Sequence, residues 1–374
     1  MVRFLLRCCS VLSAGLITAC AVAPGLRAAP QVRAVSLAAG LNHPWGLAFL
    51  PDGTLLVTER PGRLRRITAQ GLDPQPISGI PPVVAQGQGG LLDVAVHPQF
   101  AQNQWIYLAL AAGQPGAAGT RVVRGRLQNN QLTEVTTIVD MTRKTGAGQH
   151  FGARLTFDPD GFLYVATGDR GERDRSQDLG DHAGKVLRLH DDGRIPSDNP
   201  FIQQPGALPE VYSYGHRNIQ GMTTHPQTGA IWSHEHGPRG GDEINIVQAG
   251  GNYGWPLVTF GVEYSGQPVG QGATSLPGLI PPIWHWTPSI APSGMAFYQG
   301  DVFPEWQGDL FVGALAGQHL ARLQVEGESV RQEEQLLSGD VGRIRDVRVG
   351  PDGFLYLVTD AANGQVLRLE REPV

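Results

Sequence analysis

The sequence predicts an all-β fold, a six-bladed β-propeller. Gly (50 residues) and Pro (28 residues) make up about a fifth of the 374 residues, which excludes an all-helical bundle. After residue 30 no stretch keeps a 3.6-residue apolar period, while short β-rich runs bounded by Gly, Pro, Asp and Asn recur to the end. A strand–turn–strand unit recurs six times. Because such a unit cannot bury its own faces, we expect six copies to pack around an axis.

Each copy combines a small apolar strand, a Pro-containing turn and a second strand that ends in Thr or a small residue. The copies cover 46–58, 92–110, 155–167, 221–232, 294–313 and 347–359. Their spacing is typical of propeller blades with loop insertions, and a β-sandwich or a solenoid is the alternative. Asp-Gly pairs mark hairpin turns because Gly accepts the positive φ that a tight turn demands. Residues 32–37 are expected to close the ring against the last blade.

Residues 1–29 are predicted to be a signal peptide. Arg3 and Arg7 precede an apolar, uncharged stretch that is too short to span a membrane as a helix. Cys20 completes a bacterial lipobox, so acylation at Cys20 and ordinary cleavage further along both stay open. We expect an exported protein, periplasmic or anchored to the outer membrane through Cys20, with its propeller domain over 30–374.

Charge and cysteine content exclude several classes. The formal net charge is −5 and no Lys/Arg block occurs, so nucleic acid is not an expected partner. All three Cys lie in the predicted signal peptide, which leaves the domain without a disulfide, a thiolate nucleophile or a Cys-ligated metal. No glycine pattern for a nicotinamide or flavin site, no phosphate loop and no Gly-x-Ser-x-Gly turn appears. No coiled coil or apolar edge predicts an oligomer.

Four loops next to the repeat cores carry unusual polar residues, and a propeller brings such loops to one mouth of its central channel. The loops cover 87–92, 148–154, 214–221 and 235–245. His150 and Asp169 flank one strand–turn–strand unit, and a His beside a carboxylate is the arrangement of a general base held in one tautomer. The alternative is a loop His with a purely structural hydrogen bond.

Three arginines are expected near the axis. Arg343 and Arg345 stand at i and i+2, which places both side chains on one face of a strand, and Arg217 lies in another of these loops. Such a cluster repels itself unless an anion neutralises it, preferably a carboxylate bound by paired N–H donors. Surface ion pairs are the alternative, because 27 of the 29 basic residues are Arg.

The loop at 234–245 mixes two imidazoles with carboxylates and invites comparison with a zinc site. Its Gly and Pro residues instead present backbone carbonyls. Carbonyls with carboxylates are hard oxygen ligands, which suit Ca²⁺ better than Zn²⁺.

Six ordered motifs across residues 40–370 resemble one family, the soluble PQQ-dependent aldose sugar dehydrogenases of the glucose/sorbosone dehydrogenase family (PQQ is pyrroloquinoline quinone). The motifs are Gly87-Gln-Gly-Gly-Leu-Leu92, His97-Pro-Gln-Phe100, Tyr214-Gly-His-Arg-Asn218, Glu235-His-Gly-Pro-Arg-Gly-Gly-Asp-Glu-Ile-Asn245, Gly251-Asn-Tyr-Gly-Trp-Pro256 and Gly342-Arg-Ile-Arg-Asp-Val347. The resemblance implies oxidation of the C1 hydroxyl of a glucose-like aldose to the lactone, with hydride transfer to PQQ and an external electron acceptor.

The resemblance also implies roles for residues. His150 matches the family's base and Asp169 the carboxylate that orients it. The positions that match cofactor-binding residues are Gln88, Arg217, Asn218, Tyr264, Arg343 and Arg345. The carbonyls of Gly237 and Pro238 match ligands of a Ca²⁺ that contacts the cofactor, and Glu243 and Tyr253 match a second, structural Ca²⁺ site.

One position departs from the family. Ala316 stands where relatives carry a Lys against the cofactor, and Arg239 or Arg322 is the substitute that we consider. Two other functions stay open from the sequence: a Ca²⁺-dependent lactonase on a similar propeller, and a non-catalytic propeller that binds a sugar or a protein.

Overall fold

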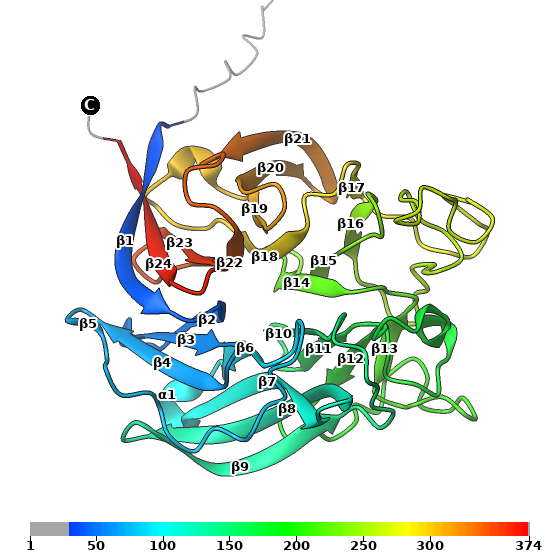
Figure 1. Ribbon diagram of the computed structural model, residues 1–374, viewed down its shortest axis with the longest axis horizontal. Helices are drawn as coiled ribbons and strands as arrows, with labels where there is room; N and C mark the ends of the chain where they lie inside the picture. Colours follow the sequence, from blue (N-terminus) through cyan, green and yellow to red (C-terminus); the bar gives the residue numbers. More distant parts are fainter. Residues whose placement is uncertain (1–29, 373–374) are drawn as a thin grey trace, which may run out of the picture.

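Six four-stranded antiparallel sheets stand in a ring, as Figure 1 shows for this computed structural model, which describes residues 30–372. The six-bladed propeller is thereby confirmed. The innermost strands of blades 1 to 6 are β2 (Pro44–Phe49), β6 (Leu91–Val96), β10 (Gly152–Phe157), β14 (Ile219–Thr224), β18 (Pro292–Phe297) and β22 (Ile344–Val349). The second strands are β3 (Leu55–Glu59), β7 (Trp105–Gln114), β11 (Leu163–Thr167), β15 (Ile231–Glu235), β19 (Leu310–Ala314) and β23 (Leu355–Thr359).

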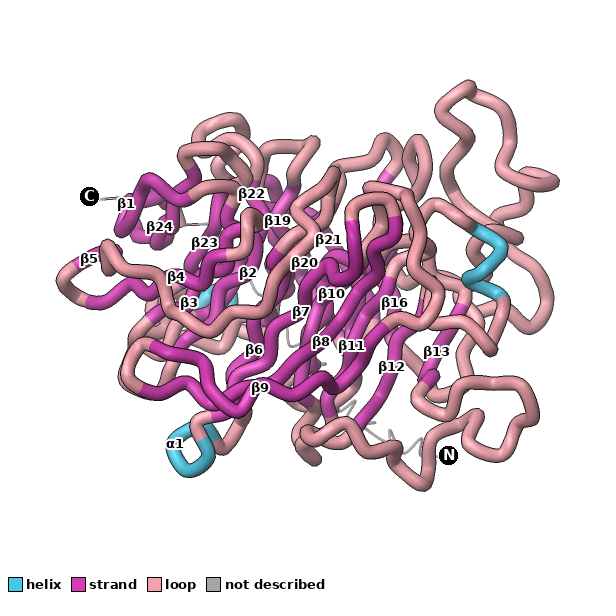
Figure 2. The backbone as a smooth tube through the Cα atoms, turned by 60° about the horizontal axis from the view of Figure 1, so that its bottom comes forward, coloured by secondary structure: helices cyan, strands magenta, loops and turns pink. Residues whose placement is uncertain are grey.

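The outer half of each blade is more variable in length. The third strands are β4 (Arg63–Thr68), β8 (Ala117–Gln128), β12 (Lys185–Leu189), β16 (Asp242–Ile246), β20 (Leu320–Glu326) and β24 (Gly364–Arg371). The outermost strands are β5 (Gly71–Leu72), β9 (Gln131–Asp140), β13 (Val211–Tyr214), β17 (Trp284–Trp286), β21 (Ser329–Leu336) and β1 (Val32–Leu41). The described helices are short: α1 (Phe100–Asn103), η1 (Arg173–Gln177) and η2 (Pro304–Trp306). Figure 2 shows α1 at one end of the molecule, away from the loops that cover the other end.

The two ends of the described chain close the ring. Strand β1 pairs antiparallel with β24, from Val32 opposite Arg371 to Leu41 opposite Gly364, so blade 6 contains the first and the last strand of the described residues. The expected closure by residues 32–37 is confirmed, and the pairing extends further than predicted. Among the described residues no helix is long and apolar enough to cross a membrane. Residues 1–29, where the predicted signal peptide and Cys20 fall, lie outside the described residues.

The third residue of every innermost strand points at the axis, and these six positions carry only three residue types. They are Gly46, Asp93, Arg154, Gly221, Gly294 and Asp346. The three glycines leave the axis to the three ionic side chains. A Cβ at Gly46 would lie 2.8 Å from Asp93 Oδ1, and one at Gly294 would collide with Asp346.

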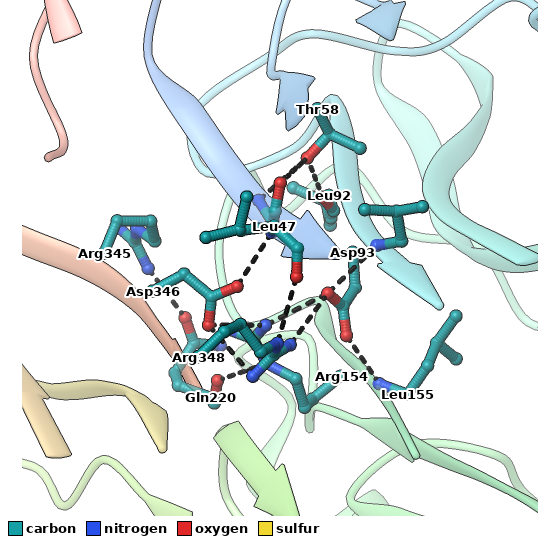
Figure 3. Close-up of polar contacts among 12 residues, drawn as sticks. Leu47, Thr58, Leu92, Asp93, Arg154, Leu155, Gln220, Arg345, Asp346 and Arg348 are labelled. Carbon is teal, nitrogen blue, oxygen red and sulfur yellow. Dashed lines mark hydrogen bonds and ion pairs between the residues drawn. The ribbon is translucent and has the colours of Figure 1, made fainter. Parts of the chain in front are cut away.

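The ionic side chains form a plug across the axis, drawn in Figure 3. Arg154 Nη1 donates to Asp93 Oδ1 at 3.0 Å and to Asp346 Oδ1 at 3.1 Å, and all three side chains are fully buried. Arg348 binds Asp346 at 3.2 Å and approaches Asp93 at 3.6 Å, so two guanidinium groups balance two carboxylates. The second carboxylate oxygens accept the N–H groups of Leu155 and Leu47 at 2.8 and 2.9 Å. The plug therefore joins blades 1, 2, 3 and 6.

We predict that Arg154→Met lowers the free energy of unfolding by about 3–5 kcal/mol, since it leaves buried carboxylates short of a cation. Chemical denaturation measures this loss. Arg331→Met is the matched control. Arg331 lies on β21 and forms an exposed ion pair with Glu326, so its substitution should change the stability little. Equal stability of the two variants would mean that the plug does not hold the ring together.

Candidate active site

A cavity of about 280 Å³ lies at the end of the axis where the innermost strands begin. Its wall consists of residues at the first two positions of these strands, of residues just before them and of residues that directly follow the second strands. The plug lies one position further along the innermost strands. Four of the residues predicted to hold the cofactor line it, namely Gln88, Asn218, Arg343 and Arg345. On the other side of the plug, the second halves of the innermost strands line a separate cavity of about 350 Å³. The plug thus forms the floor of the candidate site.

Within each blade, the innermost and second strands pair antiparallel, which brings the start of the innermost strand and the end of the second strand together at this end of the axis. In blade 3, Gly152 at the start of β10 pairs with Thr167 at the end of β11, so His150 and Asp169, two residues beyond each, meet. His150 Nδ1 lies 2.7 Å from Asp169 Oδ1. His150 adopts a positive φ of 53°, a strained conformation for a side-chain-bearing residue, and its N–H donates to Gln88 Oε1 at 2.8 Å. The fold, with the Gln88 contact, therefore fixes where the imidazole stands.

Both carboxylate oxygens of Asp169 accept hydrogen bonds within the protein. Besides His150, Asp169 accepts the N–H of Gly171 at 2.7 Å and the indole N–H of Trp255 at 2.9 Å. Burial by itself would raise the pKa of Asp169, but the hydrogen bonds from His150 and Gly171 outweigh burial and hold the pKa below its ordinary value. An ionised Asp169 accepts the Nδ1 proton of His150, which leaves Nε2 as the lone-pair nitrogen.

His150 is neutral at neutral pH. Burial is the largest influence and lowers its pKa, the hydrogen bond to Asp169 opposes burial, and the positive charge of Arg217 lowers the pKa again. Nε2 has no hydrogen-bond partner among residues 30–372, and the side chain keeps 11% of its surface exposed. The pair is thus arranged as a neutral base with one nitrogen free.

Two amide side chains of the cavity wall, Gln88 and Asn218, use their oxygens but not their NH₂ groups in hydrogen bonds with residues 30–372. Gln88 uses its oxygen on the N–H of His150, and Asn218 uses its oxygen on the N–H of Gly152 and on Gln220 Nε2, both at 3.2 Å. With their oxygens engaged by the protein, both side chains offer N–H donors to whatever occupies the cavity. Together with the arginines they make a wall rich in donors.

Arg343 and Arg345 share a protein carboxylate, contrary to the expectation that the arginine cluster lacks one. Asp360 Oδ2 lies 3.2 Å from Arg343 Nη2 and 3.3 Å from Arg345 Nη2, and Asp360 Oδ1 lies 3.1 Å from His43 Nδ1. Burial would raise the pKa of Asp360, but Arg345, His43 and Arg343 outweigh it and hold the pKa well below its usual range. The reason is the pairing of β22 with β23, which places Asp360 just past the end of β23 beside both arginines.

Arg217 stands apart from this pair. Its Nη1 donates to the carbonyl of His236 at 3.0 Å, and its guanidinium carbon lies 5.2 Å from the centre of the Trp255 ring. His236 lines this cavity together with Arg343 and Arg345, and it also lines a smaller neighbouring cavity that Arg217 lines. The three arginines therefore border the same region from two sides rather than forming one cluster.

His236 is a residue that the sequence reasoning did not single out. Its Nε2 donates to the carbonyl of Pro292 at 2.7 Å, and burial above all lowers its pKa to about 3. The imidazole is neutral at every working pH, so Nδ1 is a permanent acceptor in a wall of donors. The repeat pattern could have pointed to His236, because it directly follows β15 in the same way that Asp360 directly follows β23.

A smaller cavity of about 10 Å³ adjoins the first through His236 and contains part of the predicted calcium positions. Gly237, Glu243 and Tyr253 line it, together with Glu235. The carbonyl oxygens of Gly237 and Pro238 accept no hydrogen bond from residues 30–372. No group of three or more His, Cys, Asp or Glu side chains in the described part of the chain is arranged to hold a metal.

Glu243 lacks a cationic partner among the described residues. Burial raises its pKa well above the ordinary value, and the negative charge of Glu235 raises it further. Glu235 itself accepts the N–H of Arg217 and lies 2.8 Å from His216 Nδ1. The Tyr253 hydroxyl is engaged, because it donates to the Ile246 carbonyl and accepts the N–H of Gln248. Tyr253 can thus offer only its backbone carbonyl to a metal.

Three other residues lie away from the cavity. Tyr264 is 74% exposed and does not line it. Arg322 pairs with Asp309 and Glu334 within blade 5, and Arg239 is exposed. Neither lines the cavity, so neither is placed to substitute for the Lys that the resemblance leads us to expect at position 316.

Comparisons with known proteins agree with the fold and with the resemblance. The Glucose / Sorbosone dehydrogenase family profile matches residues 41–368. Aldose sugar dehydrogenase YliI of Escherichia coli K12 is 48% identical over 335 residues, which cover 88% of this chain and 90% of the relative. Quinoprotein glucose dehydrogenase B of Acinetobacter calcoaceticus is 27% identical over 404 residues, covering 86% of this chain and 84% of the relative.

Two solved structures show the same propeller. The apo-form of the soluble aldose sugar dehydrogenase of E. coli superposes with a TM-score of 0.89 at 46% identity, covering 91% of this chain and all of that one. The PQQ-bound form of the aldose sugar dehydrogenase of Streptomyces coelicolor gives a TM-score of 0.76 at 31% identity, covering 92% and 99%. With a profile match over nearly its whole described length and these relatives, the chain belongs to the glucose/sorbosone dehydrogenase family.

Proposed function

We propose that this protein is a PQQ-dependent aldose dehydrogenase that oxidises the C1 hydroxyl of a glucose-like sugar to the lactone. The observation that carries the proposal is a donor-lined cavity next to a neutral imidazole whose second nitrogen is free: Phe151 and Gln88, which accepts the N–H of His150, both line the cavity. A quinoprotein glucose dehydrogenase and a PQQ-bound aldose sugar dehydrogenase among the similar proteins support the proposal. When bound, PQQ supplies a quinone that accepts a hydride.

The residues present fit a polycarboxylate quinone. Arg60, Arg343 and Arg345 line the cavity against a single carboxylate, Asp360, so its charged side chains sum to a net positive charge. The NH₂ groups of Gln88 and Asn218 are donors for carboxylate or carbonyl oxygens. Such a wall would bind and orient an oxygen-rich anion and would leave an apolar or cationic ligand poorly matched.

His150 would act as the base for the sugar hydroxyl. Its Nε2 takes the proton of the C1 hydroxyl, while Asp169 keeps Nδ1 protonated and stabilises the imidazolium that forms. Asp169 keeps its own negative charge throughout, because three hydrogen-bond donors hold it. Removal of this proton would let the C1 hydrogen leave as hydride.

Calcium is proposed to bind through hard oxygen ligands beside His236. The unengaged carbonyls of Gly237 and Pro238 suit a Ca²⁺ that also contacts the cofactor, and the cation-free carboxylate of Glu243 suits a structural Ca²⁺. A bound Ca²⁺ would act as a Lewis acid toward the cofactor.

We also propose that the protein is exported and that it passes electrons to an external acceptor. Residues 1–29 read as a signal peptide, and acylation at Cys20 would give the only membrane contact that we propose. The lactonase alternative has less support, because the described residues contain no cluster of acidic side chains arranged for a channel metal.

We predict that His150→Gln lowers kcat with glucose by about 10²–10⁴-fold while PQQ binding is retained, since the lost group acts on the proton. Dye reduction measures kcat, and quenching of tryptophan fluorescence measures binding. His285→Gln is the control, because His285 is exposed on β17. Undiminished kcat in His150→Gln would remove the base from the proposal.

The pH profile follows from the lowered pKa of His150. A base with a depressed pKa stays unprotonated down to a pH below its ordinary value of 6.5, so kcat/KM should be level through neutrality and fall only in acid below that value. Rate measurements from pH 4.5 to 8.5 at constant ionic strength check this. A fall that begins above pH 7 would contradict the assignment, and the residual activity of His150→Gln should lack the acid limb.

Calcium should stabilise the protein through Glu243. At about a hundredfold excess over its dissociation constant, a ligand that binds only the folded state adds about 2.7 kcal/mol of stability, and the Tm rises accordingly. The rise should shrink as the pH falls, because protons compete for a carboxylate with a raised pKa. Glu243→Gln should remove most of the rise in thermal unfolding with CaCl₂; an equal rise in that variant would place the ion elsewhere.

A further inference from the structure

Arg60 occupies a position that the propeller repeats around the cavity. It directly follows the second strand of blade 1, β3, as His236, Leu315 and Asp360 directly follow β15, β19 and β23. All four line the cavity. Arg60 is therefore placed by the same topology that places Asp360 against the arginines of blade 6.

The backbone of Arg60 is fixed between two blades. Its N–H donates to the carbonyl of His43 at 3.1 Å, and its carbonyl accepts the N–H of Leu91 at 3.0 Å. Gly90 packs so closely on the Arg60 carbonyl that a Cβ at Gly90 would collide with it. The point from which the side chain leaves the backbone is thus held firmly.

The Arg60 side chain, by contrast, has no partner in the protein. No hydrogen bond or ion pair joins its guanidinium to any of residues 30–372, and its Nε is buried without an acceptor. The adjacent carboxylate, Glu59, is taken by Arg63 at 2.6 Å, by Arg65 and by the N–H of Asn42. Asp360 is likewise taken by Arg343, Arg345 and His43. Each nearby carboxylate is therefore already engaged.

An unpaired guanidinium beside two paired ones is unfavourable without an anion. Leu315 also lines the cavity but carries no charge, and the next residue, Ala316, has only a methyl group as its side chain. Among the guanidinium groups of the cavity wall, Arg60 is the one without an ion pair or hydrogen bond to residues 30–372, because Arg343 and Arg345 share Asp360.

We propose that Arg60 is an anion-binding residue of this cavity, which donates to a carboxylate of the cofactor and supplies the positive charge that position 316 lacks. This inference rests on the proposed function. The role is in binding: Arg60 contributes to affinity, whereas His150 acts on the substrate proton.

The test is the dissociation constant of PQQ for the full-length apoprotein in Ca²⁺-containing buffer, followed by quenching of tryptophan fluorescence, since Trp45 lines the cavity. Arg60→Gln should weaken binding about tenfold or more, the size expected for loss of a charge-assisted hydrogen bond. Arg60→Lys should recover most of the affinity because it keeps the charge. Arg331→Gln, an exposed arginine on β21, should bind as the unaltered protein does.

The outcomes separate this inference from the proposed function. Absence of PQQ binding by the unaltered protein would overturn the proposed function and the Arg60 role together. Normal binding by the unaltered protein and by Arg60→Gln alike would overturn the Arg60 role alone. A large fall in Tm for ligand-free Arg60→Gln would also overturn it, because a side chain without protein partners should not support the fold.

Discussion

The ionic plug of Asp93, Arg154, Asp346 and Arg348 is the interaction on which the rest of the molecule depends. Its charged side chains come from the innermost strands of blades 2, 3 and 6, and the backbone N–H of Leu47 connects blade 1 to them. The plug is possible only because Gly46 and Gly294 leave room at the equivalent positions of two other strands. Hydrogen bonds from Leu47 and Leu155 satisfy the remaining carboxylate oxygens, so the buried charges are compensated. The plug also closes the tunnel, which turns one end into a cavity with a floor.

The cavity wall follows from strand pairing within each blade. A residue shortly before the innermost strand meets a residue at the end of the second strand or shortly after it, and this contact recurs as His150 with Asp169, His216 with Glu235, and Arg343 with Asp360. Propeller symmetry thereby supplies one basic or polar group and one carboxylate in several blades. In the proposed function, the different residues in these equivalent places would divide the work between proton transfer, anion binding and cation binding.

Hydrogen bonding within the protein decides which atoms face the ligand. Gln88 and Asn218 present NH₂ groups because backbone N–H groups occupy their oxygens, and His150 presents Nε2 because Asp169 occupies Nδ1. His236 presents Nδ1 for the same reason. The wall is thus set before any ligand arrives, and the strained backbone of His150 is part of that arrangement.

The amino-acid sequence by itself determined the blade number, the ring closure by the first strand, the family and the meeting of His150 with Asp169. These depend on turn residues, on alternation within short strands and on partners 19 positions apart across one hairpin. The equivalence of Gly46, Asp93 and Arg154 was also readable, since it needs only the repeats in register. Tertiary structure decided the rest. Arg154 meets Asp93 and Asp346 across 61 and 192 positions, and the free guanidinium of Arg60 depends on which carboxylates its neighbours have already taken. Such contacts form between blades, where distance along the chain carries no information about distance in space.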